Sequence, residues 1–128
     1  MNILLDTHIF LWLRREPQRV SNRVLNVYYD MNNKVFLSVA SLWEMQIKSQ
    51  LGKLELDVPL SRLIEEQCKY NELQILPIEP CHIFALAELP LHHKDPFDRM
   101  LLAQSQCEHL TLASADEVFR HYQVDLLW

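Results

Sequence analysis

The chain has 128 residues, the length of one domain, and we expect a single domain over residues 1–128. Hydrophobic residues make up 49% and charged residues 23%, which excludes the intrinsically disordered class. The net charge of −5 argues against broad electrostatic adhesion to nucleic acid, so a nucleic-acid substrate would need help from a metal ion. The single glycine, Gly52, excludes a Walker loop and a dinucleotide-binding turn.

The lengths of the apolar runs and the spacing of the cysteines indicate in which cellular compartment the protein is found. The longest apolar run, Ile9 to Leu13, is too short for a membrane span or a signal-peptide core, which predicts a cytoplasmic protein. The cysteines are odd in number, widely spaced and without a C-x-x-C pair, so we expect no disulfide framework and no zinc site. We expect reduced, buried thiols at Cys68, Cys81 and Cys107.

Short apolar runs alternate with amphipathic stretches along the chain. Strands are predicted at Ile3–Leu5, Val35–Leu37, Gln74–Leu76, Leu110–Ala113 and Val124–Leu127. Helices are predicted after Asp6 and over Ser21–Tyr29, Leu42–Lys48, Pro59–Cys68, Pro80–Glu88 and Asp98–Cys107. This alternation, with short connections, predicts an α/β fold whose parallel sheet is covered on both faces.

The first strand ends abruptly at Asp6, before apolar residues resume at Ile9. Asp6 has two interpretations, which the sequence leaves equally open. It caps the following helix, or it is a functional acid at the carboxyl end of a central strand, where ligands bind in open α/β sheets. The neighbouring His8 is expected to be structural.

After the second strand, Glu44 also has two interpretations. With Ser41 it would form a capping box, and with Lys48 an ion pair four residues apart on a helix. The apolar neighbours Trp43 and Met45 instead indicate a largely buried helix, with the glutamate directed to the sheet edge.

The helix predicted from Pro80 carries no expected chemistry, and Glu79 and His82 are expected to be surface positions. The loop over residues 89–94 holds His92 and His93. Neighbouring side chains in an extended loop point apart, so we do not expect these histidines to form a metal pair.

The segment Asp95-Pro96-Phe97-Asp98 opens the next helix. Proline suits the first helical position and Asp95 can cap it, which places Asp98 in the first turn, where the helix dipole helps a carboxylate to stay ionised. Capping does not explain this second acid. Arg99 is either a solvent-facing charge or a phosphate contact.

Asp116 follows the fourth strand and would be a helix cap or a site residue. Because parallel strands connected by right-handed crossovers end at one edge of the sheet, four acids can meet there. Converging carboxylates would force protons onto one another unless a cation joins them. Oxygen ligands without cysteine or histidine favour Mg²⁺ or Mn²⁺. The four acids are Asp6, Glu44, Asp98 and Asp116.

The chain resembles PIN-domain nucleases of the VapC toxin type over nearly its whole length. The resemblance is carried by Leu4-Leu5-Asp6-Thr7-His8, Ser41-Leu42-Trp43-Glu44, Asp95-Pro96-Phe97-Asp98-Arg99 and Ser114-Ala115-Asp116. It implies a three-layer α/β/α fold with a short-stranded, mainly parallel sheet, and a metal-dependent endoribonuclease. It also implies a homodimer, inhibited by a cognate antitoxin that covers the acidic site.

The family's acidic positions map onto the same four acids, and its hydroxyl positions resemble Thr7 and Ser114. We expect Asp6, Asp98 and Asp116 to hold one or two Mg²⁺ or Mn²⁺ ions while Glu44 orients the attacking water. Asp95 competes with Asp98 for the third acidic position. Candidates for contact with the RNA backbone, which surface positions would explain equally well, are Lys48, His93 and Arg99.

Two other functions stay open from the sequence. A catalytically silent PIN-like domain could act as a protein-interaction module, although a decayed site should have lost some of its acids. A metal phosphohydrolase acting on small phosphate esters is the other alternative, but no substrate-pocket signature for it is visible.

Overall fold

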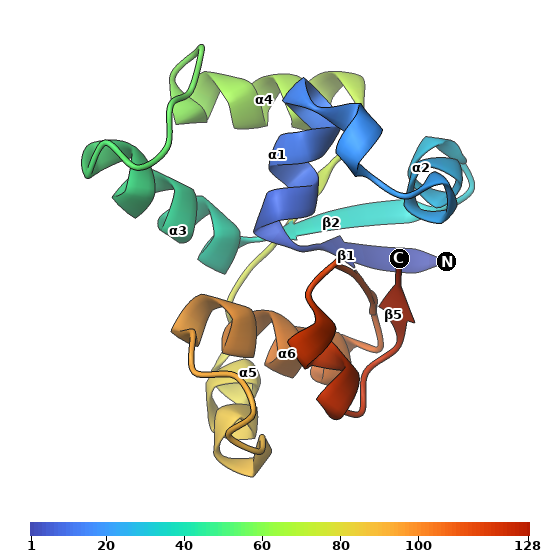
Figure 1. Ribbon diagram of the computed structural model, residues 1–128, viewed down its shortest axis with the longest axis vertical. Coiled ribbons are helices and arrows are strands. Elements are labelled where there is room, and N and C mark those ends of the chain that lie inside the picture. Colours follow the sequence, from blue (N-terminus) through green and yellow to red (C-terminus); the bar gives the residue numbers. More distant parts are fainter.

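Five short strands form a parallel sheet across the middle of the protein, in a computed structural model that describes residues 1–128 (Figure 1). The strand order is β3-β2-β1-β4-β5. The predicted α/β class and all five strands are confirmed, with the last two strands shorter than expected. The strands are β1 (Asn2–Leu5), β2 (Lys34–Ser38), β3 (Gln74–Leu76), β4 (Thr111–Ala113) and β5 (Leu126–Leu127).

Helices cover both faces of this sheet. In Figure 1, α1 to α4 lie on one side of the strands and α5 and α6 on the other, which makes the three predicted layers. The helices are α1 (Thr7–Arg15), α2 (Asn22–Tyr29), α3 (Val39–Gln50), α4 (Leu60–Tyr70), α5 (Pro80–Ala85) and α6 (Pro96–Glu108). Short 3₁₀ turns follow at η1 (Pro17–Arg19), η2 (Leu86–Glu88) and η3 (Glu117–His121).

The central strand β1 supplies a core on each side of the sheet. Successive side chains of a strand point to opposite faces, so Ile3 and Leu5 pack toward α1 to α4 whereas Leu4 packs toward α6. All three of these residues are fully buried. Because both faces of the sheet are covered, β1 is a continuous apolar run in the sequence, and the first charged residue after it, Asp6, marks its end.

The order of the strands places a switch point beside β1. The chain builds β2 and β3 outward on one side of β1, then returns to place β4 and β5 on the other side. Asp6 follows β1, and its backbone N–H donates to the carbonyl of Ala113 at the end of β4, at 3.0 Å. Ligands of open α/β sheets bind at such a point, where neighbouring crossovers leave in opposite directions.

Helix α3 begins earlier than the capping-box prediction requires. Its N-cap is Ser38, whose side chain accepts the N–H of Ala40 at 3.0 Å. Ser41 and Glu44 therefore both lie inside the helix, and the predicted capping box is wrong. The predicted ion pair is confirmed, with Lys48 Nζ 2.7 Å from Glu44 Oε2.

Two burial predictions are also wrong. His82 is fully buried, because its ring nitrogens satisfy partners on α5 and α6, and is not a surface residue. The cysteines are free, as expected, but they are not buried: Cys81 is exposed and the other two are half-buried. None of the helices has the length and apolar character needed to cross a bilayer.

Candidate metal centre at the carboxyl edge of the sheet

Asp6 caps a helix and faces the candidate site at once. Its side chain accepts the N–H of His8 at 3.4 Å through Oδ1 and the hydroxyl of Ser114 at 2.6 Å through Oδ2. The residue is only 4% exposed, and this burial raises the pKa of its carboxyl, with a smaller contribution from the charge of Glu44. The two interpretations of Asp6 left open by the sequence are therefore compatible.

Buried hydroxyl groups join the segments that carry the acids. Thr7 Oγ1 donates to Ser41 Oγ at 2.8 Å, which links the start of α1 to α3. Ser114 Oγ donates to Asp6 and also accepts the N–H of Asp116 at 3.1 Å. These bonds hold the ends of β1 and β4 and the start of α3 in one arrangement.

Glu44 presents an oxygen atom that has no partner. It is 3% exposed, and Oε2 accepts the ammonium of Lys48 while Oε1 is buried without any hydrogen bond. Buried acceptors are usually satisfied, since an unsatisfied one keeps its desolvation cost. The Glu44 carboxylate raises the pKa of Lys48, and the charges of Asp95 and Asp98 add to this, so the amine borders the acidic cluster.

Asp95 and Asp98 have different environments. Asp95 Oδ1 accepts the N–H groups of Phe97 and Asp98 at 2.9 and 3.0 Å, which confirms the predicted cap. Asp98 makes no such cap and faces the other acids. This division favours Asp98 over Asp95 as the third acid of the site.

Asp98 holds its proton more tightly than the dipole of α6 alone would favour, as expected for converging carboxylates that no cation joins. Burial, followed by the charges of the other acids, raises the pKa of its carboxyl to about 8, so the dipole of α6 does not keep it ionised at neutral pH. The acids that act on it by charge are Asp6, Asp95, Glu44 and Asp116, in that order. Residues from four separate parts of the chain therefore lie close together.

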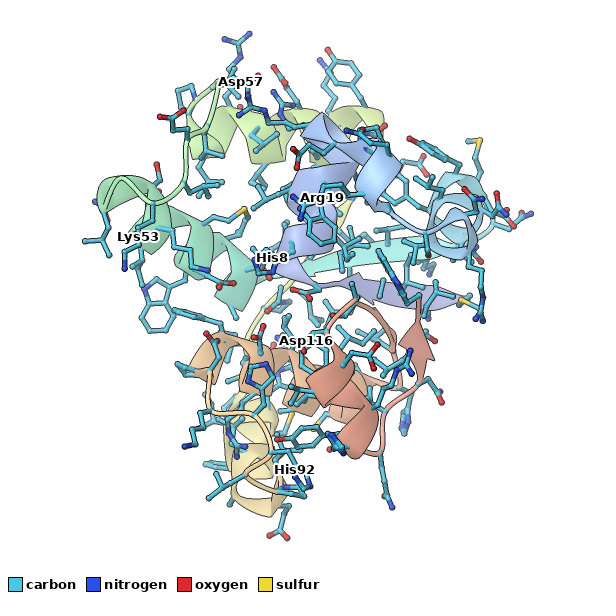
Figure 2. All side chains as sticks on the ribbon, viewed as in Figure 1. His8, Arg19, Lys53, Asp57, His92 and Asp116 are labelled. Atoms are coloured by element: carbon cyan, nitrogen blue, oxygen red, sulfur yellow. The ribbon has the colours of Figure 1, made fainter.

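A histidine lies between the last two acids. His93 Nε2 is 3.0 Å from Asp98 Oδ2 and 3.1 Å from Asp116 Oδ2. Asp116 also caps η3, accepting the N–H of Val118 at 3.0 Å. Figure 2 shows Asp116 and His8 near the same point, where the sheet meets the ends of α1, α3 and α6. No local pattern indicated this place of His93, because it depends on how the loop before α6 folds.

Arg99 has a role that the sequence did not indicate. Its guanidinium donates to the carbonyls of Pro90 and His93 at 2.9 and 3.2 Å, and to those of Leu86 and Leu89 at 3.2 and 3.3 Å. Both terminal nitrogens are thus used within the protein. The side chain holds the loop before α6, which disfavours its use as a phosphate contact.

The donor set fits a hard divalent cation. The converging groups are carboxylates, with His93 between two of them; one buried carboxylate oxygen lacks a partner, and burial followed by the charges of the other acids raises the pKa of Asp98. Carboxylate oxygens are the ligands that Mg²⁺ and Mn²⁺ prefer. A cation placed among them would offset the repulsion, and a water bound to it would give the free oxygen of Glu44 a partner.

A second cluster of metal-ligand types, at the other end of α6, does not fit a metal. His82 Nδ1 accepts the N–H of Glu79 at 2.9 Å, and its Nε2 lies 2.8 Å from Glu108 Oε1. With a hydrogen bond accepted at Nδ1, the neutral ring carries its proton on Nε2. That nitrogen then has no lone pair for a cation, so the cluster joins α5 to α6.

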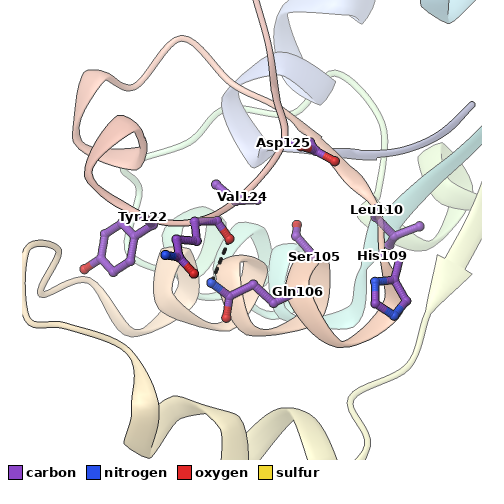
Figure 3. Close-up of a pocket in the computed structure, with 8 residues that line it drawn as sticks. Ser105, Gln106, His109, Leu110, Tyr122, Val124 and Asp125 are labelled. Carbon is purple, nitrogen blue, oxygen red and sulfur yellow. Dashed lines mark hydrogen bonds between the residues drawn. The ribbon is translucent and has the colours of Figure 1, made fainter.

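A pocket beside the C-terminal half of α6 is likewise separate from the acids. Ser105 and Gln106 of α6 and the following His109 line one side, and Tyr122 and Asp125 line it from the C-terminal segment (Figure 3). Gln106 Nε2 donates to the carbonyl of Gln123 at 3.0 Å across it. None of the predicted site residues lines this pocket.

Comparisons with known proteins agree with the fold. The PIN domain family profile matches residues 3–125. No curated protein matches the chain in sequence. Among solved structures, the chain is similar to VapBC2 from Rickettsia felis bound to a promoter DNA fragment, with 17% identity, coverage of 98% and 97% of the two chains and a TM-score of 0.75.

Two further solved structures are similar over most of their length. DNA-bound VapBC from Salmonella typhimurium has 11% identity, coverage of 98% and 96% and a TM-score of 0.71. FitAcB from Neisseria gonorrhoeae has 21% identity, coverage of 97% and 95% and a TM-score of 0.64. At these identities the likeness shows a shared fold.

Proposed function

The chain belongs to the PIN-domain family, and from this we propose that it is a metal-dependent endoribonuclease, the VapC-type toxin of a type II toxin–antitoxin pair. Residues 1–128 would form its single nuclease domain. The observation that carries the proposal is the convergence of Asp6, Glu44, Asp98 and Asp116 at the switch point of the sheet.

Each acid has a distinct proposed task. Asp6, Asp98 and Asp116 would hold Mg²⁺ or Mn²⁺, which would lower the pKa of a bound water and so provide hydroxide for attack on a phosphodiester. The unpartnered Oε1 of Glu44 would orient the attacking water. Thr7 and Ser114 would keep the segments that carry these acids in register.

RNA must approach a protein of net charge −5, so a basic side chain beside the site is needed to attract the phosphate groups. Lys48 borders the acids and is 41% exposed at its side chain, which suits it to contact a phosphate beside the site. His93 faces the acids and Arg99 is engaged with loop carbonyls, so neither is the preferred phosphate contact.

The toxin assignment rests on the kind of complexes that share the fold. VapBC from Salmonella typhimurium was solved bound to DNA, and a further similar structure is a toxin–antitoxin complex from Klebsiella pneumoniae, 20% identical with a TM-score of 0.60. We propose that this chain likewise pairs with a cognate antitoxin that covers the acidic site. A homodimer and a cytoplasmic location are further parts of the proposal.

RNA cleavage by the purified protein, with Mg²⁺ or Mn²⁺ and with EDTA, tests the activity. We expect cleavage that EDTA abolishes and that Asp6→Asn, Asp98→Asn and their double variant lack while staying folded. Asp57→Asn is the matched control, because this exposed carboxylate pairs with Arg14 far from the site (Figure 2). A folded double variant that cuts RNA at the wild-type rate would refute the assignment.

The same experiment separates the alternatives. A silent interaction module would bind Mn²⁺ weakly and cut nothing, whereas a phosphohydrolase would cleave a chromogenic phosphate ester and leave RNA intact. Growth arrest on expression, relieved by a co-expressed partner protein, would support the toxin over both.

A further inference from the structure

The imidazole of His93 is placed to organise two acids at once. Its Nε2 lies within hydrogen-bond distance of Asp98 Oδ2 and Asp116 Oδ2, and its side chain is 14% exposed. The ring also packs against Phe119, with centroids 5.4 Å apart. These contacts hold the ring over the point where the two carboxylates converge.

The hydrogen bond at the other ring nitrogen fixes the tautomer. Nδ1 of His93 accepts the backbone N–H of Asp95 at 3.3 Å. The neutral ring therefore carries its proton on Nε2, which donates to Asp116 Oδ2 at 3.1 Å, and Asp98 Oδ2 lies 3.0 Å from the same nitrogen. A nitrogen in this state is a donor and has no lone pair for a cation, so His93 acts through Asp98 and Asp116.

The loop that carries His93 is fixed by the elements that carry the acids. Tyr122, which follows η3, accepts the N–H of His93 at 2.7 Å and donates to Pro90 O at 2.8 Å. Arg99, next to Asp98 on α6, donates to the carbonyls of Pro90 and His93. The loop is therefore bound on one side by Tyr122, near Asp116, and on the other by Arg99, next to Asp98. These contacts hold His93 between the two acids.

We propose that His93 is a positioning residue of the metal centre. The Arg99 and Tyr122 contacts hold its loop, and its Nε2–H keeps the carboxyl groups of Asp98 and Asp116 close together before a cation binds. This inference rests on the proposed function. A donor placed between Asp98 and Asp116 lowers the cost of bringing their carboxyl groups together and leaves their remaining oxygens free for a cation.

Calorimetric titration of the full-length protein with Mn²⁺ tests the role without an activity assay. The variants are His93→Leu, which has no donor, and His93→Gln, whose amide N–H replaces Nε2–H. The matched control is His92→Leu, because the His92 ring packs against His121 and Tyr122 and lies apart from Asp116 (Figure 2). Thermal melts establish that each variant is folded.

We expect His93→Leu to weaken Mn²⁺ binding by about 10- to 100-fold, the usual effect of removing a partner of metal ligands. His93→Gln should recover most of this loss and His92→Leu should bind Mn²⁺ as the wild type does. Wild-type affinity in folded His93→Leu, or no recovery in His93→Gln, would overturn the positioning role.

A spectroscopic measurement on the wild type keeps the inference testable if His93→Leu does not fold. Nitrogen-15 spectra of the histidine rings should show His93 as the Nε2–H tautomer, and a proton on Nδ1 would overturn the proposal. If the wild type binds no Mn²⁺ at all, the proposed metal centre fails together with this inference. If the wild type and folded His93→Leu bind it equally, only the role of His93 fails.

Discussion

Helix α6 has a histidine–carboxylate pair at each end, and the two pairs differ in what surrounds them. Asp98 in the first turn faces His93 Nε2 at 3.0 Å, and Glu108 at the last position faces His82 Nε2 at 2.8 Å. Both histidines accept a backbone N–H at Nδ1. A similar arrangement therefore occurs at both ends of the helix, with different consequences.

The difference lies in the number of neighbouring acids. Asp98 meets the charges of four other carboxyl groups, whereas the cluster around Glu108 contains the thiol of Cys81. Helix-dipole effects are usually about 0.3–1 kcal/mol, less than one pKa unit, which burial and several like charges outweigh. A histidine–carboxylate pair by itself is a packing device, while converging carboxylates make a place for a cation.

The largest expected effect separates the two ends by activity. Asp98→Asn should lower the rate of RNA cleavage more than about 100-fold, because even partners of metal ligands contribute 10- to 100-fold. The matched change Glu108→Gln should leave the rate within about twofold. Cleavage assays at saturating Mn²⁺ check this, and equal rate losses in both variants would break the comparison.

The second effect separates the ends by stability. His82→Ala should lower the free energy of unfolding by about 2–4 kcal/mol, because it removes a fully buried ring and the hydrogen bonds that this ring makes with Glu79 and Glu108. Urea denaturation measures the loss. The Mn²⁺ affinity of the folded variant should not change. Weakened Mn²⁺ binding would show that the His82–Glu108 pair at the end of α6 affects the acidic site at its start.

The third effect is a pH dependence specific to the acidic end. The pKa of Asp98 is about 8 in the folded protein and 3.8 as its ordinary value, so between these values the folded state binds a proton that the unfolded state has lost. In EDTA, stability should be greatest below about pH 4 on this account and fall by up to about 1.4 kcal/mol per pH unit toward pH 8.

Denaturation at several pH values in EDTA measures that slope. Asp98→Asn should flatten it, since the amide has no proton to lose, and Mn²⁺ should stabilise the wild type more as the pH rises. A slope that persists in Asp98→Asn would assign the titration to another group, such as Asp6.

The smallest effect concerns the structural pair alone. Glu108→Gln keeps an oxygen that can accept from His82 Nε2, so the free energy of unfolding should change by less than about 1 kcal/mol. A loss as large as that of His82→Ala would show that the charge of Glu108, and not its hydrogen bond, holds α5 to α6.

Much of the fold could be predicted from local patterns. The apolar runs located every strand, and Pro96 after Asp95 located the start of α6. The capping box predicted for Ser41 and Glu44 was wrong because Ser38 also has a hydroxyl at a suitable place, and packing decided which serine capped α3. Local propensity proposes caps, and tertiary contacts select among them.

The sequence determined that Asp6 and Asp116 would follow strands and that Asp98 would open a helix, since a charge interrupting buried segments marks a strand end; Glu44 lies in the second turn of α3 instead. Only the tertiary structure decided their charge state and companions. The pKa of Asp98 reflects acids from other parts of the chain, and His93 reaches two of them because Arg99 and Tyr122 fix its loop. Such effects depend on distances between residues far apart in the chain, and no local pattern records those distances.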